Sequence, residues 1–272
     1  MNRTQRTGLA RETLAIVERG SYAAPSGATI ELRPAIDGML EGTVVYTPDE
    51  LSTLVSPEPA SAHATQLVVT SETTLDAAGR LVRESDEPVL ALNFASANNP
   101  GGGFLNGSQA QEESLARSSA LYPSLLRGER FYRTNRACGT CLYTDFMIYS
   151  PRVPVFRHDS GPLLEAPFTV SILTAPAANA GALKESERPR LEPVMLRRSQ
   201  LVLALAQARG YSRLVLGAWG CGVFRNDPAR VAAWFAQHLS GAFSGAFAQV
   251  VFAVYDTSDG QGTKRAFDQA FS

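Results

Sequence analysis

The chain has 272 residues, is 44% hydrophobic and 19% charged, and carries a formal net charge of −1 at pH 7. These values are typical of a folded globular protein and argue against global disorder. They also argue against a nonspecific nucleic-acid binder, which needs a surplus of Lys and Arg, although a local basic face remains possible.

Cysteine content and hydropathy narrow the class further. Three cysteines do not make a disulfide framework in a chain of this length, and the N-terminus lacks the apolar region of a signal peptide. No stretch approaches the roughly 20 apolar residues of a membrane helix. We therefore expect a cytoplasmic monomer that does not contact a membrane.

The first half of the chain opens with a helix. Residues 3–19 repeat apolar side chains at helical spacing, and Gly20 follows as a helix stop. Residues 56–64 are rich in Pro, Ser and Ala, so we expect a surface linker there. The other elements predicted in this half are strands over residues 29–32, 43–46, 66–70 and 89–94 and helices over residues 48–51, 74–83 and 114–126.

The second half alternates strands with helices. Residues 128–145 show no clear periodicity and are predicted as a long structured loop. Residues 146–149 and 153–156 are predicted as a hairpin-like pair of strands around a turn that contains proline. The remaining elements are strands over residues 168–173, 213–216 and 249–254 and helices over residues 191–209, 228–239 and 263–271. This alternation predicts an α/β layer fold with a largely parallel sheet, in which ligands bind beyond the carboxyl ends of the strands.

One stretch joins a buried strand, a glycine loop and a helix that begins with two acids. The strand over residues 89–94 leads to three glycines at 101–103 and, seven residues later, to Gln111, Glu112 and Glu113. Glycines let the backbone approach a ligand, and a helix start offers unpaired N–H groups to an anion. The stretch is therefore a candidate ligand site with two carboxylates for chemistry. The alternative is an ordinary turn, after which the acids only complement the helix dipole.

A second glycine loop follows the strand predicted over residues 213–216. It runs from Gly217 to Asn226, and the next helix begins with Asp227 as N-cap and Pro228 at its first position. Two such loops at one sheet edge could hold a diphosphate between backbone amides without any lysine. Either loop taken alone could also be only a tight turn.

The spacing of the glycines and the Gln-Glu-Glu triplet resembles the signature of poly(ADP-ribose) glycohydrolases. The lead-in LNFASANNP at residues 92–100 and the downstream SSALY at residues 118–122 look like the bacterial-type branch. The resemblance covers nearly the whole chain. It implies a macrodomain-like three-layer α/β/α fold with a mixed, largely parallel central sheet. It also implies one catalytic domain over residues 1–272, with about residues 1–60 as an N-terminal helical extension.

The resemblance also implies an activity, the hydrolysis of ribose–ribose O-glycosidic bonds without a metal or a cofactor. Glu113 would protonate the leaving 2′-oxygen and then, as a carboxylate, activate water, while Glu112 would orient ribose hydroxyls. Phe224 and the N-terminal extension would cover the continuing chain, which favours an exo mode that releases ADP-ribose. The expected partners are poly(ADP-ribose), ADP-ribose and ADP-ribosylated proteins, without sequence-specific nucleic acid.

Further substrate contacts follow from the same resemblance. One of two asparagines would read the distal ribose, the two glycine loops would embrace the diphosphate, Phe224 would pack on the distal ribose, and Tyr255 would meet the adenine. The full set assigned to substrate binding is Asn98, Asn99, Gly101, Gly102, Gly103, Gln111, Gly220, Cys221, Gly222, Val223, Phe224 and Tyr255.

Two other functions remain open from the sequence. A macrodomain that binds ADP-ribose without cleaving it does not require the Gln-Glu-Glu triplet, and a mono-ADP-ribosyl hydrolase would use the same pocket with another leaving group. The pair Cys138 and Cys141 has the spacing of half a zinc site or of a redox motif. No second closely spaced ligand pair accompanies it, and a redox motif should precede a helix. We therefore interpret both residues as ordinary loop cysteines.

Overall fold

The computed structural model of the chain describes residues 1–55 and 62–272, so residues 56–61 of the predicted linker lie outside the described residues. The helices are α1 (Arg3–Arg19), α2 (Arg33–Glu41), α3 (Pro48–Ser52), α4 (Thr74–Glu84), α5 (Gln111–Ser118), α6 (Leu121–Arg127), α7 (Glu129–Ala137), α8 (Leu191–Ala208), α9 (Pro228–Ser240) and α10 (Gly262–Ala270), with short 3-10 turns η1 (Phe104–Asn106), η2 (Ala180–Ala182) and η3 (Glu185–Arg190). The strands are β1 (Ser21–Ala23), β2 (Thr29–Glu31), β3 (Val44–Tyr46), β4 (Gln66–Thr70), β5 (Val89–Phe94), β6 (Met147–Arg157), β7 (Leu163–Ala175), β8 (Arg213–Leu216) and β9 (Gln249–Ala253).

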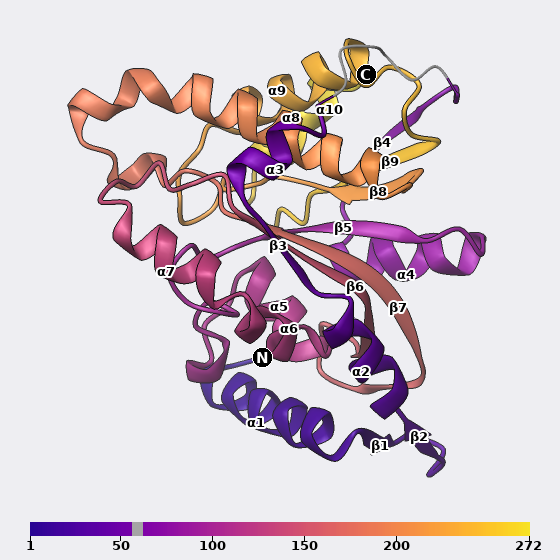
Figure 1. Cartoon of the computed structure of the whole chain (residues 1–272). Coiled ribbons are helices and arrows are strands. Elements are labelled where there is room, and N and C mark those ends of the chain that lie inside the picture. The colour runs from indigo at the N-terminus through magenta and orange to yellow at the C-terminus, as the bar shows by residue number, and fades with distance from the viewer. Residues whose placement is uncertain (56–61) are drawn as a thin grey trace.

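A seven-stranded mixed sheet organises the fold, in the order β3-β6-β7-β5-β8-β9-β4 (Figure 1). The four pairings from β7 through β5, β8 and β9 to β4 are parallel, and the two pairings of β6 are antiparallel. The expected mixed, largely parallel sheet is therefore confirmed. Because β5 and β8 are hydrogen-bonded parallel neighbours, the two glycine loops that follow them leave the same edge of the sheet.

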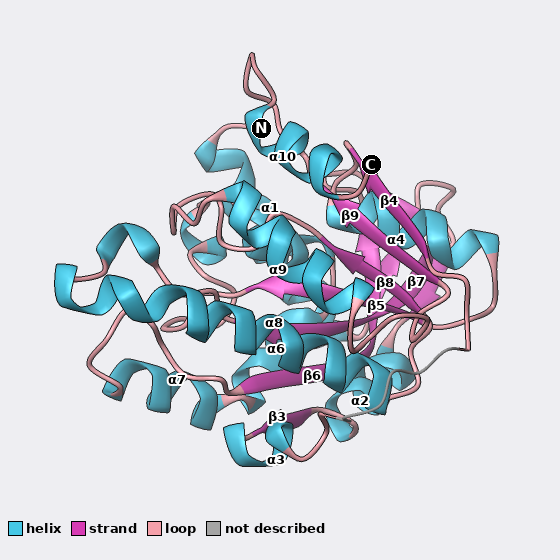
Figure 2. Cartoon of the chain, turned by 90° about the horizontal axis from the view of Figure 1, so that it is seen from above, coloured by secondary structure: helices cyan, strands magenta, loops and turns pink. Residues whose placement is uncertain are grey.

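Helices cover both faces of this sheet, so the expected three layers are confirmed (Figure 2). Strand β5 shows why: Leu90 and Leu92 belong to the core beneath α3, α8, α9 and α10, whereas Val89 and Ala91 belong to the core beneath α2, α4, α5 and α6. A strand buried on both faces needs a continuous apolar run instead of an alternating one. No helix among the described residues is long and apolar enough to cross a membrane.

The N-terminal helix packs beside the first glycine loop. A capping box between Asn2 and Gln5 starts α1, and Gly20 ends it with φ +80°. The guanidinium groups of Arg3 and Arg6 donate to the carbonyls of residues 106 and 107, at 2.9 and 2.7 Å. The predicted helix thus forms, and it buttresses the turn that follows the three glycines.

Helix α2 is missing from the sequence-based prediction. Its nine residues begin with Pro34 in the first turn and bury Ile36 and Met39 against the sheet. Only two buried side chains per two turns leave a weak periodic signal, which explains the omission.

Strand β1 is likewise absent from the predicted strands, and three of the predicted elements differ in the structure. The single helix predicted over residues 114–126 is split into α5 and α6, because Ser119 turns extended and bridges to Val155 while Ala120 donates its N–H to the carbonyl of Pro154 at 2.9 Å. The loop predicted over residues 128–145 contains α7, which buries Phe131, Tyr132 and Asn135. Pairing with β6 overrides local helix propensity at Ser119, whereas burial of one narrow stripe of side chains stabilises α7.

The predicted hairpin over residues 146–156 is also wrong, because these residues form one strand. Strand β6 pairs along its length with β7, and its register shifts between Ser150 and Val153. The shift is a β-bulge in which Arg152 has φ +44° and donates its N–H to the Ser171 hydroxyl at 2.9 Å. The proline at 151 therefore marks a bulge within a strand and not a turn between two strands.

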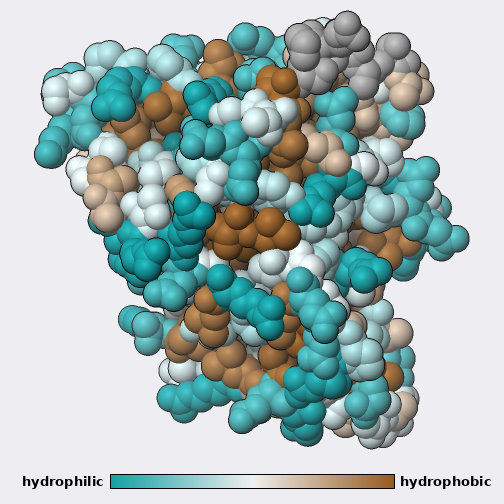
Figure 3. All heavy atoms as spheres, viewed as in Figure 1, coloured by the Kyte–Doolittle hydropathy of each residue, from teal (hydrophilic) through white to brown (hydrophobic). Residues whose placement is uncertain are grey.

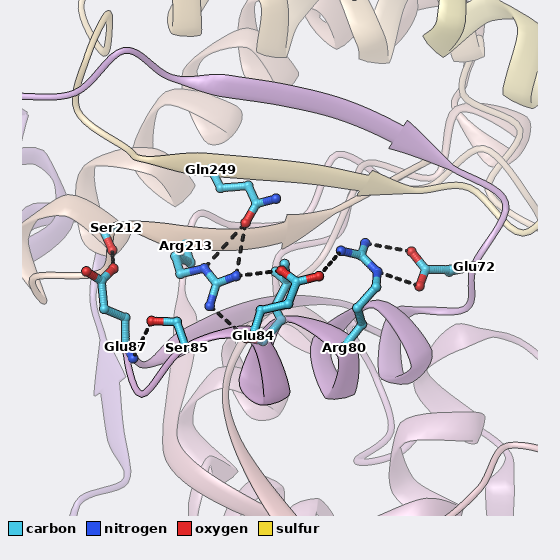
Figure 4. A network of polar contacts seen from close by, with 9 residues as sticks. Glu72, Arg80, Glu84, Ser85, Glu87, Ser212, Arg213 and Gln249 are labelled. Carbon is cyan, nitrogen blue, oxygen red and sulfur yellow. Dashed lines mark hydrogen bonds and ion pairs between the residues drawn. The ribbon is translucent and has the colours of Figure 1, made fainter.

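Arg213 joins the sheet to α4 at the opposite end of β8 from the second glycine loop (Figure 4). Its guanidinium donates to the carbonyl of Leu81 at 2.7 Å, to the Glu84 carboxylate at 2.9 Å and to the Gln249 side chain at 3.1 Å. Arg80 extends the network with a bond of 3.0 Å to the other oxygen of Glu84. One buried guanidinium thus connects β8 to the neighbouring strand β9 and to α4.

Candidate active site

The first glycine loop holds a carboxylate at the start of α5. Gly101 and Gly102 have φ +68° and +59°, a region that favours glycine. The backbone N–H of Gly103 donates to Glu113 Oε1 at 2.9 Å. A Cβ on Gly102 would collide with this same oxygen and would lie 3.3 Å from Glu112 Oε2. The loop therefore accepts only glycine where it passes beneath the two acids.

Glu112 occupies a very different environment from Glu113, although the two are adjacent in sequence. Its side chain is only 3% exposed, and it accepts the Ser96 N–H at 2.6 Å and the Asn93 side-chain amide at 3.3 Å. Burial raises the pKa of Glu112 to about 8, against the opposing effect of these two hydrogen bonds. The group is therefore neutral at pH 7, while Glu113 is only half-buried.

Gln111 faces the sheet. Its carbonyl oxygen accepts the Phe94 N–H at 2.9 Å, and its amide nitrogen donates to the Leu92 carbonyl at 2.7 Å and to the Thr74 hydroxyl at 3.1 Å. These contacts tie the start of α5 to the end of β5 and to α4. A substrate contact by Gln111 stays a prediction, because its amide is already occupied by the protein.

Asn98 and Asn99 lie in the turn between β5 and the glycines, and both are exposed. The Ser96 hydroxyl accepts their backbone N–H groups, at 3.3 and 3.1 Å, and so fixes the turn. Arg136 of α7 donates to the Asn98 carbonyl at 2.6 Å. Both side chains are thus presented at the same sheet edge as Glu113.

The second loop turns sharply at Gly220 and is held in place by Asn226. The backbone of Gly220 has φ +75°, and a Cβ there would lie 2.5 Å from the Ala177 Cβ. The Asn226 amide donates to the carbonyls of Ala178 and Gly220, at 2.8 and 3.1 Å. Gly222 faces open space without a left-handed backbone, and Val223 is 80% exposed. The base of the loop is rigid, and its tip is accessible.

The other predicted contacts lie around this second loop. Phe224 is half-buried, with its ring centroid 6.0 Å from that of Tyr143. Burial raises the pKa of the half-buried Cys221 to about 12, so its thiol is not a nucleophile at neutral pH. Tyr255 follows β9 and is 67% exposed. Asp227 caps α9 by accepting the N–H of residue 229 at 2.8 Å, as the sequence predicts.

Three residues of the site were missed from the sequence. Asn93, fully buried in β5, holds Glu112 and donates to the Thr174 hydroxyl at 3.1 Å. Arg117 is 2% exposed and donates to the Ser108 carbonyl at 2.9 Å, which shapes the segment between the glycines and α5. Trp219 donates its indole N–H to a β7 carbonyl at 3.1 Å beneath the second loop. An asparagine inside an apolar strand is the one signal that could have been noticed.

The two cysteines of the Cys-x-x-Cys pair come after a helix. Cys138 caps the end of α7 and donates its S–H to the carbonyls of Asn135 and Thr140, at 3.0 and 3.2 Å. All three cysteines are free. No group of three or more His, Cys, Asp or Glu side chains suited to a metal is found among residues 1–55 and 62–272.

Comparison with known proteins identifies close relatives of this arrangement. A sequence model for the catalytic domain of microbial-type PARG matches residues 10–158. The structure of poly(ADP-ribose) glycohydrolase (PARG) from Thermomonospora curvata is 48% identical, with a TM-score of 0.95 over 98% of this chain and 99% of that chain. The same enzyme bound to the inhibitor ADP-HPD gives a TM-score of 0.92 at 48% identity over 97% and 98% of the two chains.

A second bacterial relative adds a bound ligand of another kind. PARG from Deinococcus radiodurans in complex with ADP-ribose is 48% identical, with a TM-score of 0.83 over 87% of this chain and 97% of that chain. Comparison with curated proteins gives no match.

Proposed function

The chain belongs to the microbial-type poly(ADP-ribose) glycohydrolase family, and on this premise we propose how it hydrolyses the ribose–ribose O-glycosidic bonds of poly(ADP-ribose). The observation that carries the proposal is the pair of unlike carboxyl groups above the glycine loop. Glu113 is half-buried and bound to the Gly103 N–H, whereas Glu112 is buried and neutral. Two acids in different environments are suited to two different tasks.

Glu113 acts as the acid and then as the base. One oxygen is fixed by the Gly103 N–H, and no hydrogen bond to its second oxygen is found within the described part of the chain. That oxygen is available to protonate the leaving 2′-oxygen while the bond to the distal ribose breaks through an oxocarbenium-like state. The resulting carboxylate removes a proton from the attacking water, which restores the acid.

Glu112 positions the substrate. Because it is neutral at pH 7, it places no second negative charge beside Glu113 or beside the substrate diphosphate. The N–H of Ser96 and the amide of Asn93 fix its carboxyl group, so it presents a rigid partner for a ribose hydroxyl.

The two loops bind the diphosphate and the distal ribose. Gly101, Gly102 and Gly103 lie on one wall, and the segment from Gly220 to Phe224 lies on the other, at the ends of neighbouring strands. Backbone N–H groups at this edge hold the anion, in keeping with the absence of a net positive charge on the chain. Phe224 packs on the distal ribose, and Tyr255 meets the adenine.

The enzyme acts from chain ends in this proposal. The terminal unit fills the cleft, Phe224 closes over its distal ribose, and α1 supports the loop from the other side through Arg3 and Arg6. Free ADP-ribose is then the first product. Early release of long internal fragments in yields equal to free ADP-ribose would contradict the exo mode.

The test compares Glu113→Gln with a matched variant, Asp49→Asn. Asp49 is an exposed acid in the first turn of α3, so its replacement removes one helix-start carboxylate outside the cleft. On defined poly(ADP-ribose), Glu113→Gln should lose on the order of 10³-fold in kcat, as expected when an essential acid and base is removed, and Asp49→Asn should retain wild-type turnover. Turnover of Glu113→Gln within a few-fold of wild type would remove Glu113 from the chemistry.

Calorimetry separates binding from catalysis. The wild-type protein and Glu113→Gln should bind ADP-ribose with similar affinity, because the diphosphate contacts come from backbone amides of the loops. If the wild-type protein binds no ADP-ribose, the cleft assignment itself is wrong.

A further inference from the structure

Helix α7 presents a row of arginines to solvent. Arg130, Arg133 and Arg136 are exposed, while Phe131 and Tyr132 face the core. At about 100° per residue, side chains three positions apart spread over an arc of about 120° on one side of the helix. None of the three forms an ion pair with an acid among the described residues. Figure 3 shows the flank that contains α7 as largely hydrophilic.

This row begins at the active site. The guanidinium of Arg136 donates to the carbonyl of Asn98, in the turn that leads to the glycines. Arg136 and Asn98 also line a cavity of about 220 Å³, together with Tyr143 and Lys184. The Tyr143 ring lies beside Phe224, with centroids 6.0 Å apart. The cavity therefore borders the turn that contains Asn98, and its Tyr143 wall lies beside Phe224 of the second glycine loop.

The cavity and the row have a positive balance of charge. Glu187 also lines the cavity, and hydrogen bonds from the Thr140 hydroxyl and the Lys184 N–H lower its pKa, so it remains a carboxylate. Arg136 and Lys184 outweigh it by one charge. Along the helix, Arg130 lies near Glu50, and its guanidinium lies over the Phe146 ring, 5.3 Å from the ring centroid. Glu129 is the acid in the first turn of the same helix. On a chain with a net charge of −1, this is a local basic face.

We propose that this cavity and the outer face of α7 bind the part of poly(ADP-ribose) that lies outside the cleft. The diphosphate of the penultimate unit lies between Arg136 and Lys184, and the next unit follows Arg133 and Arg130 along the helix. The repeating diphosphate makes the polymer a polyanion, which is the partner that a row of unpaired arginines recognises. The inference rests on the proposed function, because it requires that a terminal unit occupy the neighbouring cleft.

The first experiment measures binding without turnover, in Glu113→Gln protein. Arg133→Glu reverses one charge of the row, and Arg83→Glu makes the same change at an exposed residue of α4 without an ion pair among the described residues. Figures 1 and 2 place α4 on the other side of the molecule from α7. With labelled long-chain poly(ADP-ribose), Arg133→Glu should weaken binding by about fivefold at low salt and lower the salt slope by about one, and Arg83→Glu should change neither.

A second variant tests the cavity. Free ADP-ribose serves as the control ligand, because it occupies the cleft without reaching the cavity or α7. Adding Lys184→Glu to Arg133→Glu should weaken polymer binding further, while the affinity for free ADP-ribose stays within about twofold. In wild-type background the same double variant should raise KM for long chains more than it lowers kcat.

Three results would overturn the inference. Equal losses for Arg133→Glu and Arg83→Glu would show a general effect of charge, and unchanged polymer affinity in the double variant would remove α7 from the path. Single-stranded DNA that competes as strongly as unlabelled polymer would make the row a general polyanion surface. Failure of the proposed function gives a different result, in which the wild-type protein does not hydrolyse poly(ADP-ribose). Polymer binding by Arg133→Glu and Arg83→Glu can still be compared in that case.

Discussion

Two neighbouring glutamates differ because their backbones point them to different surroundings. Glu112 is directed back to the end of β5, where Asn93 and the Ser96 N–H receive it, and Glu113 is directed to the glycines. The division of roles therefore depends on residues that are not themselves acidic. A change at Asn93 should act on catalysis through Glu112.

The pKa of Glu112 makes a prediction about stability and pH. The unfolded chain releases this proton near the ordinary value of 4.5, and the folded protein keeps it up to about 8. The folded state thus binds more protons in this window, and the free energy of unfolding falls as pH rises from about 4.5 to about 8. Glu112→Gln removes this dependence, so its stability relative to wild type should increase by on the order of 2–4 kcal/mol between pH 5 and pH 8.

Urea denaturation at the two pH values measures this difference. Asp49→Asn, in which an exposed acid is replaced, gives the general effect of losing one carboxylate. A parallel pH response of wild type and Glu112→Gln would mean that Glu112 is ionised in the folded protein.

Sequence could not reveal how these side chains are held. The spacing of Gln111, Glu112 and Glu113 after three glycines is local information and points to the site directly. By contrast, Thr174 lies 81 residues from Asn93, so nothing in the local pattern marks their contact. The amide of Gln111 is a similar case, because its partners belong to the strand that it follows and to α4.

Gly102 in the first glycine loop is predicted not to tolerate a side chain, for two separate reasons. Gly102→Ala places a side chain at φ +59° and against Glu113, whereas Gly210→Ala places one at φ +76° in open space. Each should lose about 1–2 kcal/mol of stability from backbone strain. Only Gly102→Ala should also lose on the order of 100-fold in kcat, because it displaces the carboxylate of Glu113, the proposed acid and base.

Thermal unfolding and steady-state kinetics of the two alanine variants give the answer. Similar kcat values for both would show that the loop can move without disturbing Glu113.

Elements whose signals are local were predicted well, and those decided by partners were not. Strand β5, the capped start of α9 and the stop of α1 at Gly20 each depend on residues within the element. Helix α7 was mistaken for a loop because its surface is rich in arginine and only one narrow stripe is buried. The bulge near Arg152 depends on the Ser171 hydroxyl of β7, which lies 19 residues away.

In the molecule as a whole, the residues that stabilise the sheet and the loops proposed to bind substrate lie at opposite ends of the strands. Arg213, 6% exposed, lies at the start of β8, and the second glycine loop leaves its end. Arg213→Met should therefore lower the free energy of unfolding by about 2–3 kcal/mol through the loss of its hydrogen bonds to Leu81, Glu84 and Gln249, with kcat unchanged.

Arg83→Met provides the comparison, because Arg83 is an exposed residue of α4, the helix that Arg213 binds. Its free energy of unfolding should stay within about 0.5 kcal/mol of wild type. Denaturant titration and turnover of folded protein are measured on the same samples. A loss of kcat in Arg213→Met would mean that the two ends of the sheet are coupled.

The adjacency of β5 and β8 has a further consequence for what the cleft admits. The two loops leave strands that are about 5 Å apart, which is the distance set by backbone hydrogen bonding. Changes in loop sequence can alter the length and the lining of the two loops. The distance between the loops where they leave β5 and β8 is fixed by the pairing of these strands. We therefore expect the base of the cleft to accommodate one diphosphate between the two loops.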